Sequence, residues 1–210
     1  MLGAVRFRRF AWIASVPALL MTATCSRPSP EASYASGLQA ARAAKDDAFK
    51  TSTDSPIPPG RRAARLPLAY FAPDQDYIAS ASLAPAGPDE RPTVEMPTST
   101  GKMRTMQRVG RLEFVLKGQS LALGAFIEAG SPDTDRLFVP FTDLTSGTET
   151  YPAGRYLDLL RTPTGIYLID FNRAYHPYCY YNPAYDCPYP PPENRLTIPI
   201  RAGERMARAK

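Results

Sequence analysis

Histidine, cysteine and tryptophan are scarce in this chain of 210 residues, and their scarcity restricts the chemistry that it can support. The only histidine, His176, is not accompanied by a Gly-x-Ser-x-Gly motif that would supply a serine nucleophile. The three cysteines and the histidine do not have the spacing of a zinc knuckle, so neither a metal site nor a cofactor is expected. The glycine spacing of a phosphate-binding loop is also missing.

Net charge is small once the first residues are set aside. The whole chain carries 25 basic and 20 acidic side chains, a net charge of +5. Residues 1–24 contribute three arginines and no acidic residue, which leaves a net charge of +2 on the remainder. The spacings of RNA-recognition, helix-turn-helix and zinc-finger motifs are absent as well. Nucleic acid is therefore not an expected partner.

Residues 1–24 have the composition of an export signal. Arg6, Arg8 and Arg9 precede the stretch from Phe10 to Thr24, which is uncharged, apolar or small, and too short to span a bilayer comfortably. The alternative is an N-terminal membrane anchor that is never cleaved. The sequence favours a signal peptide, and it predicts a cell-envelope protein that is lipid-anchored, periplasmic or secreted.

Cys25 stands where a lipoprotein cysteine would, directly after Leu20-Met21-Thr22-Ala23-Thr24. Ala23 fits the small residues that the signal peptidase requires, whereas Thr22 and Thr24 depart from the usual pattern. Lipidation of Cys25 would attach the protein to the membrane surface, with marginal affinity for one acyl chain and stable anchoring for several. Lipidation and plain secretion both remain open.

The rest of the chain shows one main domain with an N-terminal extension. Ser26 to Ser33 is polar and proline-rich, as in a tether, and Ala35 to Lys50 has the spacing of a short amphipathic helix with Ser36 as N-cap. Two turn-rich stretches, Thr51 to Pro67 and Pro85 to Pro97, are expected to be irregular. The predicted segments are a signal peptide at 1–24, a tether and short helix at 25–55, a single β-rich domain at 56–204 and a basic tail at 205–210.

Alternating hydrophobicity after Lys102 predicts β-strands. Leu112, Phe114 and Leu116 alternate with polar residues between Gly110 and Gly118, as in a strand with one face toward solvent. More strands are expected at Leu121 to Ile127, Leu137 to Phe141, Arg155 to Arg161 and Gly165 to Asn172. These short strands and the 23 prolines predict a mainly β protein, a small antiparallel barrel or sandwich with one N-terminal helix.

The turn sequence Thr162-Pro163-Thr164-Gly165 predicts a hairpin between the last two strands. In that register Arg155 lies opposite Asn172 and on the same face as Asp170. Asp170 is flanked by apolar residues, and a buried carboxylate must be paired or neutral, so Arg155 is its expected partner. The pair is either a structural ion pair or part of a binding pocket with Asn172.

The loop from Asp143 to Gly154 is rich in hydroxyl groups and joins two predicted strands. Its residues Glu149 and Tyr151 are candidates for the same pocket as Asp170. The alternative is that the hydroxyl groups of the loop only cap turns.

Tyr175 to Pro192 contains six of the twelve tyrosines together with His176, Cys179 and Cys187. Tyrosine rings are suited to stacking on sugar rings or to covering the edge of a sheet, so this stretch is either a C-terminal lid over the pocket or a structural plug. In an oxidising compartment Cys179 and Cys187 are expected to form a disulfide. A metal pair and free or reactive thiols are the alternatives.

Three of these stretches resemble a known family. Phe138-Val139-Pro140-Phe141, Thr145 to Tyr151 and the block from Asp170 to Glu204 are similar to the signature of domain-of-unknown-function family 1684 (DUF1684), whose members are bacterial and uncharacterised. The resemblance runs from about Lys45 to Glu204 and implies no activity. That family usually carries Asn where this chain has His176, which argues against an essential catalytic histidine.

Two functions are compatible with these features. The first is an exported envelope protein whose β-domain binds a small ligand, a glycan or another protein, and the tyrosine density favours it. The alternative is a hydrolase-type enzyme that uses Asp170 with Arg155 and Asn172, with Glu149 or Glu193 as further carboxylates. Catalytic carboxylates would need an open pocket, so the geometry around Asp170 decides between the two.

Overall fold

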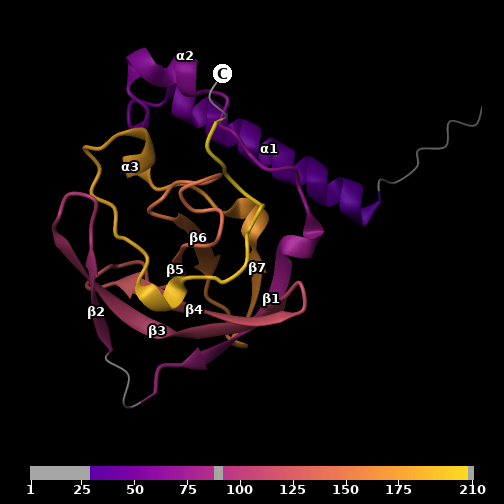
Figure 1. Ribbon diagram of the computed structural model, residues 1–210, viewed down its shortest axis with the longest axis vertical. Coiled ribbons are helices and arrows are strands. Elements are labelled where there is room, and N and C mark those ends of the chain that lie inside the picture. The colour runs from indigo at the N-terminus through magenta and orange to yellow at the C-terminus, as the bar shows by residue number, and fades with distance from the viewer. Residues whose placement is uncertain (1–28, 88–91, 208–210) are drawn as a thin grey trace, which may run out of the picture.

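A curled antiparallel sheet and one long helix dominate the computed structural model, which describes residues 29–87 and 92–207 (Figure 1). The described helices are α1 (Pro30–Thr51), α2 (Arg62–Arg65) and α3 (Tyr178–Tyr181), with the short 3-10 helices η1 (Pro59–Arg61), η2 (Gln75–Tyr77), η3 (Phe171–Arg173) and η4 (Pro192–Asn194). The described strands are β1 (Ile78–Pro85), β2 (Thr93–Pro97), β3 (Met103–Leu116), β4 (Gln119–Glu128), β5 (Arg136–Phe141), β6 (Arg155–Leu160) and β7 (Ile166–Asp170).

The sheet has the strand order β6-β5-β4-β3-β1-β7, with β2 paired to the first half of β3. Every strand pair is antiparallel. The sheet curls so far that β6 and β7, at its two ends, contact each other and nearly close a barrel. The predicted mainly β class, with an antiparallel barrel-like sheet and an N-terminal helix, is confirmed.

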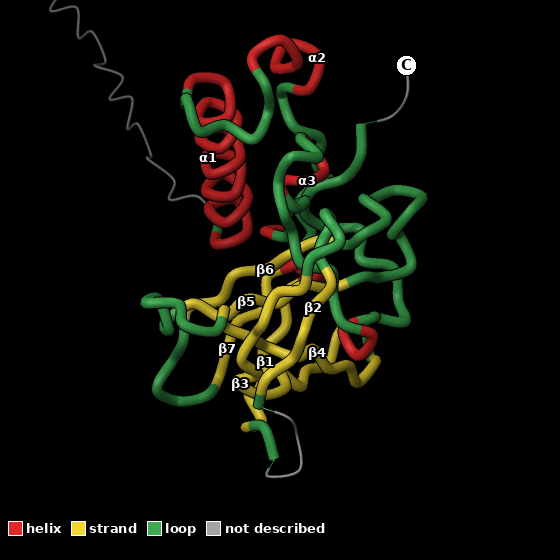
Figure 2. Tube along the Cα trace, turned by 90° about the vertical axis from the view of Figure 1, so that its left-hand side faces the viewer, coloured by secondary structure: helices red, strands yellow, loops and turns green. Residues whose placement is uncertain are grey.

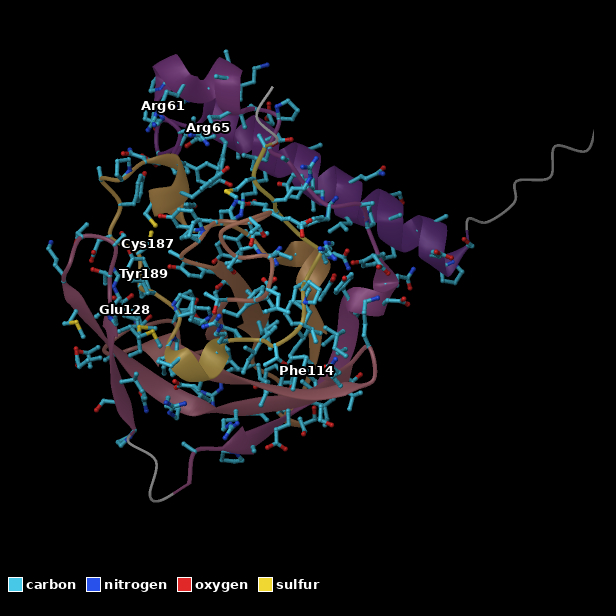
Figure 3. All side chains as sticks on the ribbon, viewed as in Figure 1. Arg61, Arg65, Phe114, Glu128, Cys187 and Tyr189 are labelled. Atoms are coloured by element: carbon cyan, nitrogen blue, oxygen red, sulfur yellow. The ribbon has the colours of Figure 1, made fainter. Side chains whose placement is uncertain are left out.

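The alternation of Leu112, Phe114 and Leu116 has the predicted result, because all three side chains are buried inside the curled sheet while their neighbours are exposed. The strand does not begin at Gly110, however, since β3 extends back to Met103. Gly110 lies instead at a β-bulge, where a side chain would collide with the carbonyl oxygen of Ala84 on β1. Figure 3 shows Phe114 among the side chains of the interior.

The predicted hairpin between β6 and β7 is wrong. β6 pairs with β5, so that Arg155 lies opposite Phe141, whereas β7 pairs with β1, so that Asp170 lies opposite Ile78. The strand β1 has a sequence rich in Ala and Ser, which gives no strong strand signal, and β2 lies within a stretch expected to be irregular. The turn sequence therefore led to the wrong partner strand for both β6 and β7.

The N-terminal helix exists as predicted but begins earlier. Ser29, not Ser36, is the N-cap, with the amide of Ala32 donating to its hydroxyl at 3.2 Å, and Pro30 occupies the first turn. The described part of the expected tether, from Pro30 onward, is therefore helical. Figure 2 shows α1, α2 and α3 at one end of the molecule, with the strands at the other.

Helix α1 is held on the domain by both apolar and polar side chains. Leu38 and Phe49 are buried, and Tyr34, Arg42 and Lys45 donate hydrogen bonds to groups far along the chain. Among the described residues, none of the helices combines the length and the apolar character that crossing a membrane requires. The predicted signal peptide and Cys25 lie outside the described residues.

A second apolar layer lies on the outer face of the sheet. On β4, Leu123, Ala125 and Ile127 belong to the core inside the sheet, whereas Phe126 packs with Met96 and other residues on the opposite face. This explains why the β4 sequence is evenly apolar rather than alternating. The C-terminal segment, residues 174–207, covers part of this outer face and borders a cavity there.

Candidate functional site

Arg155, the first predicted pocket residue, is completely buried and bound to the protein itself. Its guanidinium donates to the carboxylate of Asp143 at 2.9 Å, to the carbonyl oxygens of Ile200 at 2.7 Å and Glu204 at 3.1 Å, and to that of Ala202. Burial lowers the pKa of Arg155, and the charge of Asp143 opposes that shift. Arg155 thus holds the C-terminal segment against β6.

Asp170 is not the partner of Arg155, contrary to the prediction. Its carboxylate accepts hydrogen bonds from the hydroxyl of Tyr34 at 2.9 Å, from the Nε of Arg173 at 3.1 Å and from the backbone amide of Asn172 at 3.0 Å. Asp170 is therefore the N-cap of η3 and a docking point for α1. The cause of the error is the pairing of β7 with β1, which places Asp170 away from Arg155.

The other candidate residues also serve separate contacts. The side chain of Asn172 bonds both backbone groups of Asp74, with its Nδ2 donating at 2.8 Å and its Oδ1 accepting at 2.9 Å. Glu149 forms an exposed ion pair with Arg201 at 2.8 Å. Tyr151 packs against the ring of Tyr180, with 5.3 Å between ring centroids. The structure therefore does not unite the five predicted pocket residues.

The hydroxyl groups of the loop from Asp143 to Gly154 cap turns, which is the alternative that the sequence offered to a binding pocket. The hydroxyl and the amide of Thr145 both donate to Asp143, at 2.6 and 2.8 Å, and the hydroxyl of Thr150 lies 3.0 Å from that of Thr145. Asp143 is thereby oriented toward Arg155.

His176 is buried beside a second buried carboxylate, Glu204. The Nε2 atom of His176 accepts from the amide of Tyr151 at 3.3 Å, and Glu204 accepts from the amide of His176, the hydroxyl of Tyr181 and the amine of Lys45 at 2.6–2.7 Å. Burial, followed by the positive charges of Arg155 and Lys45, lowers the pKa of His176 well below its usual value. The imidazole is therefore neutral, with its Nε2 atom occupied by the amide of Tyr151.

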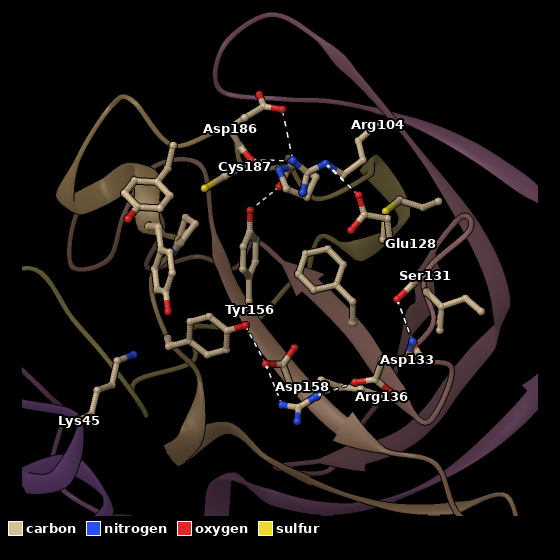
Figure 4. A pocket seen from close by; sticks show the side chains of 18 residues that line it. Lys45, Arg104, Glu128, Ser131, Asp133, Arg136, Tyr156, Asp158, Asp186 and Cys187 are labelled. Carbon is tan, nitrogen blue, oxygen red and sulfur yellow. Dashed lines mark hydrogen bonds and ion pairs between the residues drawn. The ribbon is translucent and has the colours of Figure 1, made fainter. Parts of the chain in front are cut away.

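A cavity of about 570 Å³ lies on the outer face of the sheet, under the segment that was predicted to be a lid. Figure 4 shows its walls. Its lining comprises ends of β3 and β4 (Arg104, Met106, Ile127, Glu128), the following loop (Ser131, Asp133), β5 and β6 (Arg136, Phe138, Tyr156, Asp158), Lys45 of α1 and the C-terminal segment (Tyr175, Pro177, Tyr178, Tyr185, Asp186, Cys187, Pro188). This volume lies within the range of about 300–1,000 Å³ that is usual for small-molecule sites.

Aromatic rings form one wall of this cavity. Tyr156 packs edge-to-face against Phe138 at 4.7 Å and against Tyr175 at 5.8 Å, measured between ring centroids. Tyr178 and Tyr185 form a second pair at 5.2 Å. Tyr178 is 41% exposed, a high value for a side chain of this size, so its ring is accessible to a ligand.

Paired charges form the opposite rim. Arg104 lies 3.2 Å from Asp186 and 3.7 Å from Glu128, measured from guanidinium nitrogen to carboxylate oxygen. Across the cavity, the hydroxyl of Tyr175 donates to Asp158 at 2.9 Å. The rim thus presents hydrogen-bond donors and acceptors together, without an excess of positive charge (Figure 4).

Cys179 and Cys187 are neighbouring free thiols, so the predicted disulfide is not present in the structure. The amide of Cys179 lies 3.2 Å from the Sγ of Cys187. Among the residues that the structure describes, no group of three or more His, Cys, Asp and Glu side chains is arranged to hold a metal ion.

The sequence predicted only the C-terminal part of the cavity lining. The tyrosine-rich stretch was identified, but Phe138, Tyr156 and Asp158 were not, because they are spread over two strands. A signal was available, since Phe138 and Tyr156 point away from the core residues Val139 and Leu157. Large aromatic residues on both faces of a strand indicate that the outer face is covered.

Comparison with known proteins finds a family model and a solved structure that are similar to this chain. A family model described as "Protein of unknown function (DUF1684)" matches residues 66–205. An uncharacterised protein of Haloarcula marismortui, solved in solution by NMR, is 36% identical, with a TM-score of 0.65; the alignment covers 83% of this chain and 95% of that one. No curated protein matches the chain.

Proposed function

This chain belongs to the DUF1684 family of proteins of unknown function, and from that premise we propose that it binds a small, neutral ligand rich in hydroxyl groups, such as a short glycan, in the cavity under its C-terminal segment. The observation that carries the proposal is the combination of an aromatic wall, with the ring of Tyr178 exposed, and a rim of paired charges. Tyrosine rings offer flat apolar area to a sugar ring, while carboxylates and guanidinium groups accept from and donate to its hydroxyl groups.

Charge balance favours a neutral ligand over an anionic one. Lys45, Arg104 and Arg136 are the cations that line the cavity, and four carboxylates line it with them: Glu128, Asp133, Asp158 and Asp186. Every cation already has a carboxylate within 4 Å. An anionic ligand would have to displace one of these carboxylates, whereas a hydroxyl group can bond beside them.

The test is titration of the protein with neutral mono- and disaccharides and with their uronic acid counterparts, followed by NMR and calorimetry. We expect the neutral sugars to bind, and Tyr178→Ala to weaken binding about fivefold, the equivalent of roughly 1 kcal/mol for one lost ring. Tyr180→Ala is the matched control, because Tyr180 lies in the same helix but does not line the cavity. Equal affinity in the wild type and in Tyr178→Ala would refute the proposal, as would binding of none of the sugars.

The positions of Arg155 and Asp170 do not favour the hydrolase alternative. Arg155 and Asp170 are each engaged in contacts that hold the fold together, and they do not share a site. Arg155 would have to leave a buried partner before it could act on a substrate, which is costly, and Asp170 is itself buried and occupied by Tyr34, Asn172 and Arg173.

We further propose that this ligand-binding domain acts outside the cytoplasmic membrane. Support comes from the basic, then apolar, composition of residues 1–24 and from the position of Cys25. Since α1 begins at Pro30, only residues 26–29 separate Cys25 from the domain, and a lipid on Cys25 would keep the domain close to the membrane surface. Mass spectrometry of the protein from its host decides this: an intact Met1 in the mature protein would contradict it.

A further inference from the structure

The two thiols beside the cavity come from different parts of the C-terminal segment. Cys179 belongs to α3, whereas Cys187 is fixed against Ser99, whose amide donates to the carbonyl oxygen of Cys187 at 2.9 Å and whose hydroxyl accepts from its amide at 3.0 Å. Both cysteines pack on Tyr156 in one apolar cluster. Two backbone segments therefore hold the two cysteines side by side in the folded protein.

The two cysteines differ in their relation to the cavity. Cys187 lines it, as Figure 4 shows, whereas Cys179 is not among the lining residues, and its Sγ lies 4.0 Å from the hydroxyl of Tyr151. A reagent that enters the cavity thus meets Cys187 first. Arg104 stands on the same side of the cavity, bonded to the carbonyl oxygen of the preceding residue, Asp186, at 2.9 Å.

The environment of the pair favours a shared proton. A hydrogen bond between the two side chains lowers the pKa of Cys179 to about 6 and raises the pKa of Cys187. At neutral pH the pair therefore loses one proton readily and keeps the other between its two sulfur atoms. A thiolate in contact with a thiol is the state from which thiol–disulfide exchange begins.

We propose that Cys179 and Cys187 form a redox-active dithiol that is oxidised by small-molecule disulfides entering through the cavity. Cys187 is the attacking residue because it lines the cavity, and Cys179 is the resolving one. Since the resting thiolate is on Cys179, the proton of Cys187 must move to Cys179 before the attack. In the first step Cys187 passes its proton to Cys179 and its sulfur attacks the disulfide RSSR, forming a mixed disulfide and releasing RS⁻. In the second step the proton on Cys179 goes to RS⁻, the Cys179 thiolate attacks the Sγ of Cys187, and a second RS⁻ leaves.

The reaction starts with one proton on the pair, on Cys187, because Cys179 has released its own proton to water. The proton of Cys187 passes through Cys179 to the first RS⁻, and the second RS⁻ takes one proton from water, which replaces the proton that Cys179 released. Over the whole reaction two protein thiols become one disulfide, and RSSR is reduced to two RSH. The proposal does not require the glycan-binding function, because it uses the cavity only as an entrance.

The experiment follows the reduced protein with oxidised glutathione by mass spectrometry and peptide mapping. We expect the wild type to form the Cys179–Cys187 disulfide and dithiothreitol to restore both thiols without denaturant. Cys179→Ser should accumulate glutathione on Cys187, because the resolving thiol is missing. Cys187→Ser should acquire glutathione on Cys179 more than about tenfold more slowly, because Cys179 does not line the cavity. Mapping separates these sites from Cys25.

Three results would overturn the proposal. The first is wild-type protein that keeps both thiols at saturating glutathione disulfide. The second is equal adduct rates for the two single variants while circular dichroism shows both to be folded. The third is a disulfide that resists dithiothreitol until the protein is denatured, which would identify a permanent structural bond. If a Cys→Ser variant does not fold, the corresponding Cys→Ala variant replaces it. Unfolded wild-type protein serves as the reference, because its rate of glutathione adduct formation is the rate without protection by the fold.

Discussion

Arg155 is the largest completely buried side chain in the described part of the chain, and its charge has one carboxylate partner. The other ligands of its guanidinium are carbonyl oxygens of residues 200–204, so one side chain fastens the C-terminal segment to the sheet. A buried ion pair gains little stability relative to an apolar substitute, but breaking it on one side leaves an uncompensated charge.

Asp143→Asn should therefore destabilise the protein strongly, by about 3–5 kcal/mol. Asp170→Asn should cost about 1–2 kcal/mol, because the Arg173 that it pairs with is largely exposed and its charge stays hydrated. Urea denaturation monitored by circular dichroism measures both. A larger loss for Asp170→Asn than for Asp143→Asn would show that the buried pair at Arg155 is not the stronger constraint.

His176 makes stability depend on pH in a defined direction. Its pKa is lowered in the folded protein, so the unfolded chain, with a pKa near 6.5, binds a proton that the folded protein excludes. Stability is therefore unaffected by this group above about pH 6.5 and falls as the pH drops below it, by up to about 1.4 kcal/mol per pH unit.

We expect the free energy of unfolding to fall between pH 6.5 and pH 5, and His176→Gln to remove most of that slope. Glutamine keeps an acceptor for the amide of Tyr151 but does not titrate. Denaturation series at half-unit pH steps measure the slope for each protein. A slope that is unchanged in His176→Gln would assign the effect to other groups.

At the scale of elements, α1 connects the N-terminal part of the domain to the cavity. Phe49 packs edge-to-face on Tyr178 and Tyr181, with centroid distances of 6.1 and 5.6 Å, and Tyr178 lines the cavity. The family match begins at residue 66, so this helix lies before the matched region, yet one of its residues, Lys45, lines the cavity as well.

Phe49→Ala should cost about 3–5 kcal/mol as a buried aromatic residue and should also weaken ligand binding, because Tyr178 loses its support. Gln39→Ala, an exposed change on the same helix, should alter neither property. Thermal denaturation and sugar titration of the three proteins test this. A Phe49→Ala protein that is destabilised but binds sugar with wild-type affinity would show that α1 does not support the ligand-binding cavity.

The elements that the sequence predicted correctly are those whose signal is local. Leu112, Phe114 and Leu116 define β3 by alternation alone, and the helix is found from the spacing of Leu38 and Phe49. The pairing of β7 with β1 could not be found in the same way, because turn residues constrain only the adjacent strands. The predicted site failed with that pairing, since Arg155 and Asp170 were brought together only by the assumed hairpin.

At the scale of the whole molecule, the curled sheet has one core inside and a second apolar layer outside. The C-terminal segment covers that outer layer and carries both cysteines, the tyrosine pair of the cavity and the backbone that Arg155 binds. Its attachment at several points makes the segment a fixed part of the fold, in contrast to a mobile lid.

Oxidation of the two thiols should therefore stabilise the protein. Closing a loop of nine residues reduces the entropy of the unfolded chain and contributes about 2.6 kcal/mol in the chain-entropy model. We expect the oxidised protein to unfold at higher urea concentration than the reduced protein, whereas the double variant Cys179→Ala, Cys187→Ala should unfold at the same concentration under both conditions. Oxidised protein that is less stable than reduced protein would mean that the two sulfur atoms cannot bond without distorting the cavity wall, and the dithiol proposal would then lose its geometric basis.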